Sequence, residues 1–88
     1  PPRSTLFPYT TLFRSPHYHK RSTELYYVLD GGGEVVLDGV AHPVTKGSLV
    51  HIPPGVVHGA RGKMRVLVVG VPDIAEDDYF EPEETSAA

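Results

Sequence analysis

The 88-residue chain contains no cysteine and no tryptophan, and it has no long hydrophobic run. Without cysteine there is no disulfide framework and no thiolate ligand for a metal, although this absence does not fix the compartment. No apolar stretch approaches the roughly 20 residues that a membrane-spanning helix requires. We therefore expect no membrane partner, and we expect a cytoplasmic protein.

Basic residues are also few, because 8 Lys and Arg face 11 Asp and Glu in the whole chain. An acidic balance of this kind disfavours nucleic acid as a partner. The acids concentrate near the end of the sequence. We predict that residues 73–88 form an acidic C-terminal tail that is largely solvated, as such ends usually are, with Tyr79 and Phe80 anchoring it on the body.

The first fifteen residues look foreign to the rest of the chain. They repeat a short pattern, Arg3-Ser4-Thr5-Leu6-Phe7 and then Thr11 to Ser15. Written back into codons, all of them fit one frame of an adapter oligonucleotide used in short-read sequencing. We interpret residues 1–15 as a non-native segment and exclude it from functional reasoning. The native part then starts at Pro16 without an initiator Met, so we expect an N-terminally truncated fragment. The alternative is a natural β-prone N-terminus.

Short strand patterns fill most of the chain after Pro16. β-branched and aromatic residues dominate the runs, and glycine, proline and aspartate mark the breaks. We predict extended runs at 25–29, 34–37, 40–45, 48–52, 56–60 and 64–71, in addition to the first stretch after Pro16. The breaks are predicted at 30–33, 38–39, 46–47, 53–55 and 61–63. Such spacing without helical periodicity predicts an all-β sandwich or barrel, which we assign to residues 16–72.

Side-chain alternation in the run at 25–29 predicts an inner and an outer face. The inner set is Glu24, Tyr26 and Val28, and the outer set is Leu25, Tyr27 and Leu29. Tyr26 is therefore a candidate for lining a pocket, although filling the core is the commoner role of a buried aromatic. The apolar outer face needs a cover, either a partner or a missing strand, and we expect a homodimer.

Three histidines and one glutamate are the candidate metal ligands. On an extended chain His17 and His19 point the same way, and Glu24 can rejoin them if the next strand folds back. His58, in a turn-rich segment, is available as a third imidazole. Three nitrogens and one oxygen leave coordination positions open, which suits Fe, Mn, Ni or Zn as a divalent ion. A metal-free, hydrogen-bonded polar cluster of the same residues is the alternative.

The spacing of these residues resembles the two sequence motifs of the cupin superfamily. The first motif is matched by His17-x-His19, four further residues, Glu24, six further residues and Gly31. The second motif is matched by Gly47, five further residues, Pro53-x-Gly55, two further residues and His58. The resemblance implies a jelly-roll β-barrel with His17, His19, Glu24 and His58 as metal ligands. Gly62 departs from the family pattern, which has an asparagine there.

The resemblance and the residues leave three functional classes open. The first is a small metal-dependent enzyme, either a dioxygenase or a sugar-type isomerase or epimerase, acting on a small polar substrate. The second is a module that binds a small-molecule ligand without turnover, and the third is a non-catalytic oligomerising barrel. Apart from the ligands, Tyr26 is the one inward polar group, so no general base is evident. His42 and His51 do not fit the ligand spacing and are interpreted as structural or solvent-facing.

Overall fold

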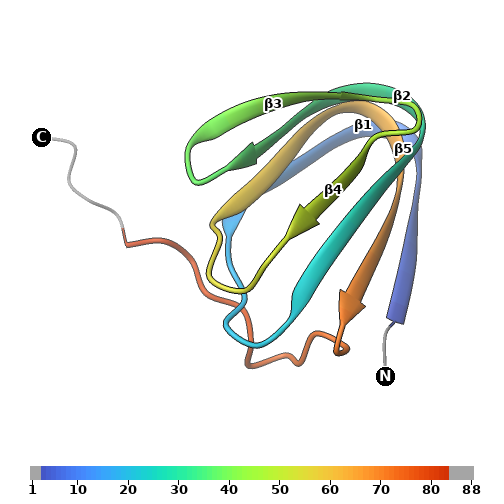
Figure 1. Ribbon diagram of the computed structural model, residues 1–88. Helices are drawn as coiled ribbons and strands as arrows, with labels where there is room; N and C mark the ends of the chain where they lie inside the picture. The colour runs from blue at the N-terminus through green and yellow to red at the C-terminus, as the bar shows by residue number, and fades with distance from the viewer. Residues whose placement is uncertain (1–2, 84–88) are drawn as a thin grey trace, which may run out of the picture.

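The computed structural model describes the backbone of residues 3–83 and, within that range, the side chains of residue 4 and residues 13–83. Its five strands are β1 (Arg3–His17), β2 (Thr23–Leu37), β3 (Val40–Thr45), β4 (Leu49–Ile52) and β5 (His58–Val71). They form one antiparallel sheet in the order β1-β5-β2-β3, with β4 also paired to β2. Figure 1 shows this sheet curling around its own interior, so the predicted all-β jelly-roll barrel is confirmed. Among the described residues, no helix has the length and apolar character needed to cross a membrane.

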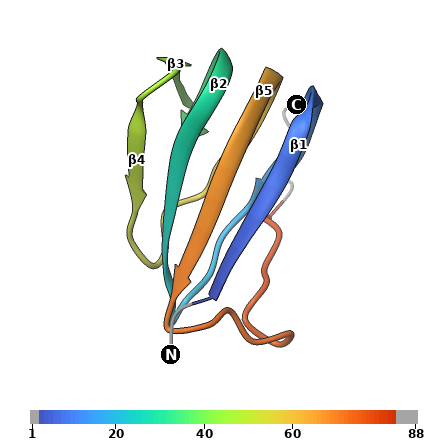
Figure 2. The same ribbon diagram turned by 90° about the vertical axis from the view of Figure 1, so that its right-hand side faces the viewer.

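The sheet is folded into two halves because β2 has a different neighbour along each part of its length. Residues 24–27 of β2 pair with β4, whereas residues 32–37 pair with β3. On its other side β2 pairs with β5 along nearly its whole length, and β5 in turn pairs with β1. The long strands therefore bend together, and the interior lies on the concave side of the bend (Figure 2).

Glycines that face each other permit this bend. Gly33 of β2 is the register partner of Gly62 of β5. A Cβ built on Gly62 would lie 2.6 Å from the Gly32 carbonyl oxygen, and one built on Gly33 would lie 2.8 Å from the Gly62 Cα and closer still to the Arg61 carbonyl oxygen. Since real side chains do not tolerate such approaches, the two paired backbones come together at a point where only glycine fits.

Two of the predicted breaks are therefore wrong. Residues 30–33 and 61–63 do not form turns that separate strands; they lie inside the continuous strands β2 and β5. A glycine in a sequence is equally compatible with a turn and with a close approach of two backbones, and in β2 and β5 the close approach requires it. The predicted turns at 38–39, 46–47 and 53–55 do separate strands. Asp38 and Gly39 have φ values of 48° and 83°, as the two central residues of a tight hairpin turn require.

The predicted alternation of side chains in β2 is confirmed. Glu24, Tyr26 and Val28 are buried, whereas Tyr27 is exposed and its neighbours on the outer face are half-buried. Inside the curl, the buried members of β2 pack with apolar residues of the other strands. This core contains Tyr26, Val28, Val35, Val44, Ile52, Ala60, Met64 and Val66.

The backbone of residues 3–14 pairs with β5 as the outermost strand of the sheet. Strand pairing uses backbone groups that every sequence carries, so it does not indicate where this segment came from. The non-native origin of residues 1–15, the truncation and the domain boundaries at 16–72 and 73–88 stay predictions. Residues 1–2 and 84–88 lie outside the described part of the chain.

The acidic C-terminal part is not simply solvated. Tyr18 and Phe80 form an isolated antiparallel bridge, and their rings stack with centroids 5.5 Å apart. Tyr79 packs with its ring against His17. Tyr79 and Phe80 therefore do hold this part of the chain against the body. Asp78, which directly precedes these two aromatic residues, is completely buried. This burial differs from the prediction of a largely solvated tail.

We predict that Gly33→Ala destabilises the fold by more than about 2 kcal/mol, because its methyl group overpacks against the backbone of β5. Gly47→Ala is the matched control. Gly47 has a positive φ of 91° but open space around its Cβ position, so it should cost only about 1 kcal/mol of backbone strain. Urea unfolding of both variants measures the difference, and equal costs would contradict the close approach.

Candidate metal centre

The four predicted ligands come together at one end of the interior. His17, His19, Glu24 and His58 each offer one ligand atom, and these atoms all lie within 4.8 Å of one another. His17 ends β1 and His58 begins β5, where the two are register partners. Glu24 is the second residue of β2, and His19 lies in the connection between β1 and β2. All four side chains are buried.

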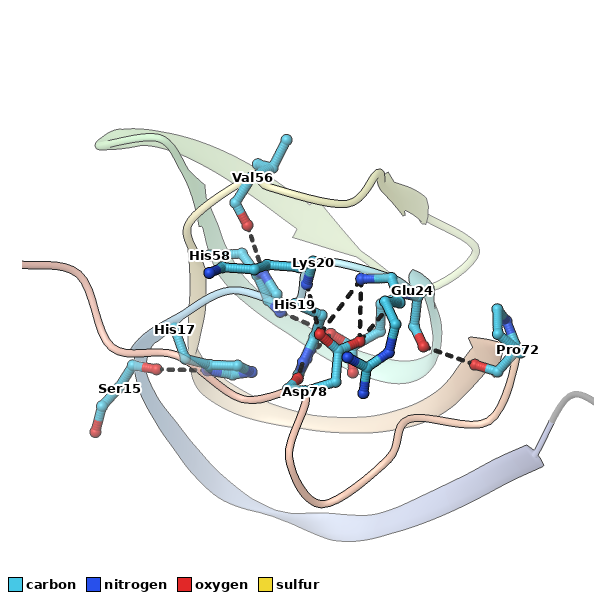
Figure 3. Close-up of polar contacts among 11 residues, drawn as sticks. Ser15, His17, His19, Lys20, Glu24, Val56, His58, Pro72 and Asp78 are labelled. Carbon is cyan, nitrogen blue, oxygen red and sulfur yellow. Dashed lines mark hydrogen bonds and ion pairs between the residues drawn. The ribbon is translucent and has the colours of Figure 1, made fainter.

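Each imidazole is oriented by a hydrogen bond from its Nδ1 atom to a backbone carbonyl. His17 Nδ1 lies 2.9 Å from the Ser15 oxygen, and His58 Nδ1 lies 2.9 Å from the Val56 oxygen. His19 Nδ1 contacts the Asp78 carbonyl oxygen in the same way (Figure 3). Because a carbonyl can only accept, each Nδ1 must carry the proton and donate it. The Nε2 lone pairs of the neutral rings are thereby left available as ligands.

The Nε2 atoms meet the Glu24 carboxylate inside the cluster. Glu24 Oε1 lies 2.6 Å from His58 Nε2 and 3.6 Å from His19 Nε2. Since His58 already donates through Nδ1, its lone pair and the carboxylate repel each other unless a proton or a cation lies between them. Within the described residues, His19 Nε2 is buried without a hydrogen-bond partner. A divalent metal would satisfy both the unpartnered nitrogen and the facing lone pairs, so these residues fit one.

The electrostatics of the cluster favour the protonation states that bind a metal. Burial lowers the pKa of His17, and the nearby imidazoles of His58 and His19 lower it further, against the opposing effects of the Ser15 hydrogen bond and the Glu24 charge. Burial would raise the pKa of Glu24, but the close contact with His58 Nε2 and the positive charge that the imidazoles carry whenever they are protonated outweigh it and lower this pKa. A neutral imidazole and an ionised carboxylate are the forms that ligate.

Two tyrosines lie against the cluster. Tyr26 is buried in the core, with its ring centroid 6.1 Å from that of His58. Burial, together with the charge of Glu24, raises the pKa of the Tyr26 hydroxyl, so this group can donate a proton in a hydrogen bond but cannot act as a base near neutral pH. Its assignment to a substrate pocket stays a prediction. Tyr79 stacks on His17 with ring centroids 4.8 Å apart, and 49% of its surface is exposed.

The contacts that Asp78 and Tyr79 make with the cluster were not predicted from the sequence. Both residues lie more than fifty positions from the histidines that they contact, and no motif spacing connects them. The one available signal was an acid placed directly before two aromatic residues. His42 and His51 are exposed and lie outside the cluster, as expected; they line a separate cavity of about 380 Å³ between β3 and β4.

A curled antiparallel sheet with three imidazoles and a carboxylate gathered inside defines a small β-barrel protein with a candidate metal site. The model of the Cupin domain family matches residues 7–70, which is most of the chain. The chain therefore belongs to the cupin family, and the resemblance of its two motifs is confirmed.

Comparison with known proteins gives relatives in bacteria and archaea. The chain is 39% identical over 83 residues to protein SchB of Streptomyces halstedii, covering 84% of this chain and 60% of that protein. It is 32% identical over 66 residues to the uncharacterized protein MJ1618 of Methanocaldococcus jannaschii, covering 70% and 53%. The chain thus spans just over half the length of these two relatives.

Among solved structures, the fold is similar to that of Pac13, a nucleoside dehydratase from Streptomyces. The TM-score is 0.75 at 25% sequence identity, and the match covers 97% of this chain and 76% of Pac13. Variants of Pac13 have also been solved with uridine.

We predict that the metal-free protein loses stability as the pH falls below about 6.5. The pKa of His17 is lower in the folded state than its ordinary value of 6.5, so in this range the unfolded chain binds more protons and unfolding becomes easier. Urea unfolding at a series of pH values measures the effect. His17→Gln removes the titrating group, so the dependence near pH 6 should become flatter, and an unchanged profile would contradict the assignment.

Proposed function

We propose that this cupin holds one divalent metal ion through His17, His19, Glu24 and His58 and uses it on a small hydroxylated substrate. The observation that carries the proposal is the buried set of three Nε2 atoms around one carboxylate, with His19 Nε2 left unpartnered within the described chain. Soluble cores rarely gather three imidazoles and an acid unless the group binds something. Iron, manganese, nickel and zinc all remain compatible with this donor set.

The residues of the chain would prepare the site before any substrate arrives. The Nδ1 hydrogen bonds hold the three imidazoles in one tautomer, which raises their basicity as ligands and limits their rotation. Glu24 contributes the negative charge that offsets part of the charge of a divalent ion. A bound ion would supply a Lewis acid that polarises an oxygen of the substrate. The apolar core behind Tyr26 excludes water from the inner side.

Tyr79 is the group that we expect to meet the substrate. Its ring rests on His17 and its edge approaches His19, yet half of its surface remains open to solvent. An aromatic face beside the ligands is suited to stacking on a flat ring or on the apolar face of a sugar. With Tyr26 held in its protonated form, the chain can donate hydrogen bonds to substrate oxygens at this end of the barrel.

The similarity to Pac13 supports a substrate of the sugar or nucleoside kind, because Pac13 is a nucleoside dehydratase and its variants were solved with uridine. Elimination and isomerisation of hydroxylated compounds need acid–base and Lewis-acid chemistry and no redox change at the metal. We therefore favour the isomerase or lyase class over a dioxygenase. A ligand-binding role without turnover is the alternative, and it would use the same residues.

Metal binding is the first test of this proposal. Calorimetric titration of the metal-free protein with Zn²⁺ or Mn²⁺ should give one site per chain. Glu24→Gln and His58→Ala should each weaken binding by more than the roughly 10- to 100-fold that loss of an outer-shell partner costs. His51→Ala, which removes an exposed histidine of β4, is the control and should bind as the unchanged chain does. Equal affinity in all four proteins would refute the site.

Turnover is the second test. The metal-loaded protein is incubated with uridine, other nucleosides and simple sugar derivatives, and the products are analysed by mass spectrometry. We predict either loss of one water or rearrangement at unchanged mass, and neither should occur with Glu24→Gln. Gain of oxygen atoms would instead identify a dioxygenase, and binding without any product would favour the ligand-binding alternative.

A homodimer also stays a proposal, and it rests on the outer face of the sheet. Tyr27 and Leu49 are register partners on neighbouring strands, and both are exposed, at 42% and 66% of their surfaces. Adjacent exposed apolar side chains of this kind often mark a contact between subunits. The molar mass of the protein in solution tests the homodimer: twice the mass of one chain is expected, and the mass of a single chain would contradict it. A cytoplasmic location likewise stays a prediction.

A further inference from the structure

The C-terminal segment, residues 72–83, is tied to the ligand loop, residues 17–24. Tyr18 and Phe80 exchange two backbone hydrogen bonds of 2.9 and 3.0 Å. Ser22 Oγ donates to the Pro72 carbonyl oxygen at 2.9 Å, and the Lys20 ammonium lies 4.2 Å from the centre of the Phe80 ring. The bonded residues lie 50 or more positions apart in the sequence, so these bonds join the C-terminal segment to the candidate metal centre.

Asp78 is the central residue of this connection. Its side chain is fully buried, and its carboxylate accepts from the backbone N–H groups of three consecutive residues, Lys20, Arg21 and Ser22. Figure 3 shows the contact with Lys20. The Lys20 amide donates to Oδ1 at 2.7 Å, and the Arg21 and Ser22 amides donate to Oδ2 at 3.1 and 3.2 Å. Successive amides that converge on one anion form a nest, which holds a carboxylate strongly.

The main chain of the same residue holds a metal ligand. The Asp78 carbonyl oxygen accepts the hydrogen bond from His19 Nδ1, and the Asp78 amide donates to the Ala75 carbonyl oxygen at 2.9 Å. His17 and His58 differ in this respect, because each donates to a carbonyl only two residues away in its own strand or turn. Of the three Nδ1 hydrogen bonds, the one from His19 therefore depends on a distant segment, and the Asp78 side chain fixes that segment in place.

We propose that Asp78 is a positioning residue of the metal centre. By holding three amides of the ligand loop with its carboxylate, it places its own carbonyl where the His19 ring must donate, and this directs His19 Nε2 toward His17, Glu24 and His58. The proposal deepens the proposed function and rests on it for the role of the cluster as a metal site. The competing view is that Asp78 only anchors the C-terminal segment, with no effect on His19.

The test compares Asp78→Asn with Asp77→Asn. Both variants remove one negative charge from neighbouring positions, but Asp77 is exposed and, within the described residues, its one ion pair is with the Arg21 side chain, at 2.6 Å. An asparagine at position 78 turns an NH₂ group toward amides that themselves donate, so the nest is broken. We expect Co²⁺ affinity to fall by about 10- to 100-fold in Asp78→Asn and to stay within about twofold of the unchanged chain in Asp77→Asn.

A second readout separates positioning from simple anchoring. NMR of the metal-free proteins detects the three protected imidazole Nδ1 protons. In Asp78→Asn the His19 Nδ1 proton should lose its protection and exchange away. The Nδ1 protons of His17 and His58 should stay protected, because their acceptor carbonyls lie outside the C-terminal segment. Unchanged His19 signal and unchanged Co²⁺ affinity would overturn the proposal. If the unchanged chain itself binds no metal, the proposed function fails, and the NMR comparison still decides whether Asp78 orients His19.

Hydrogen exchange in the unchanged chain keeps the proposal testable even if Asp78→Asn does not fold. Coupling between two sites is reciprocal, so a metal that fixes His19 must also steady the segment that orients it. Adding Co²⁺ should slow exchange at the Asp78 and Phe80 amides. The Ser48 amide, which is bonded to the Thr45 carbonyl in the turn between β3 and β4, is the internal control and should not change. Slower exchange confined to residues 17–24 would contradict the proposal.

Discussion

The structure depends on the way in which three imidazoles are held by backbone carbonyls. Each ring donates its one proton through Nδ1, and this leaves three Nε2 lone pairs turned toward a single carboxylate. Such an arrangement is costly in the absence of a cation, since lone pairs face one another in a buried space and one nitrogen has no partner among the described residues. The rest of the chain supplies the rigidity that keeps these groups together.

That rigidity comes from the bend of the sheet. Glu24 lies in the part of β2 that pairs with β4, whereas His58 is paired with Leu37 at the opposite end of β2. The two side chains can share a site because β2 and β5 curl together between them, along the stretch in which Gly33 is paired with Gly62. The same bend encloses the apolar core, so the geometry of the candidate metal centre and the stability of the barrel have a common origin.

The sequence was sufficient to predict which residues form the buried cluster, because strand alternation and motif spacing are local properties. His17, His19, Glu24 and His58 could be named in advance, as could the inward direction of Tyr26 and the turn at Asp38-Gly39. The continuity of the strands through 30–33 and 61–63 could not be predicted, since glycine occurs both in turns and where two backbones approach closely. The role of Asp78 could not be predicted for another reason. Its partners are more than fifty residues away in the sequence, and one acidic residue in an acidic segment gives no indication that it is buried.

Membership in the cupin family fixes the fold, and the donor set indicates the chemistry. The central claim is that these four side chains share one metal ion. A crystal structure of the Zn²⁺-loaded protein, with the ion located by its anomalous scattering, tests it most directly. We predict one strong peak about 2.0–2.2 Å from three Nε2 atoms and one Glu24 oxygen. A peak elsewhere, for instance between His42 and His51, with the cluster still bonded to itself, would contradict the account.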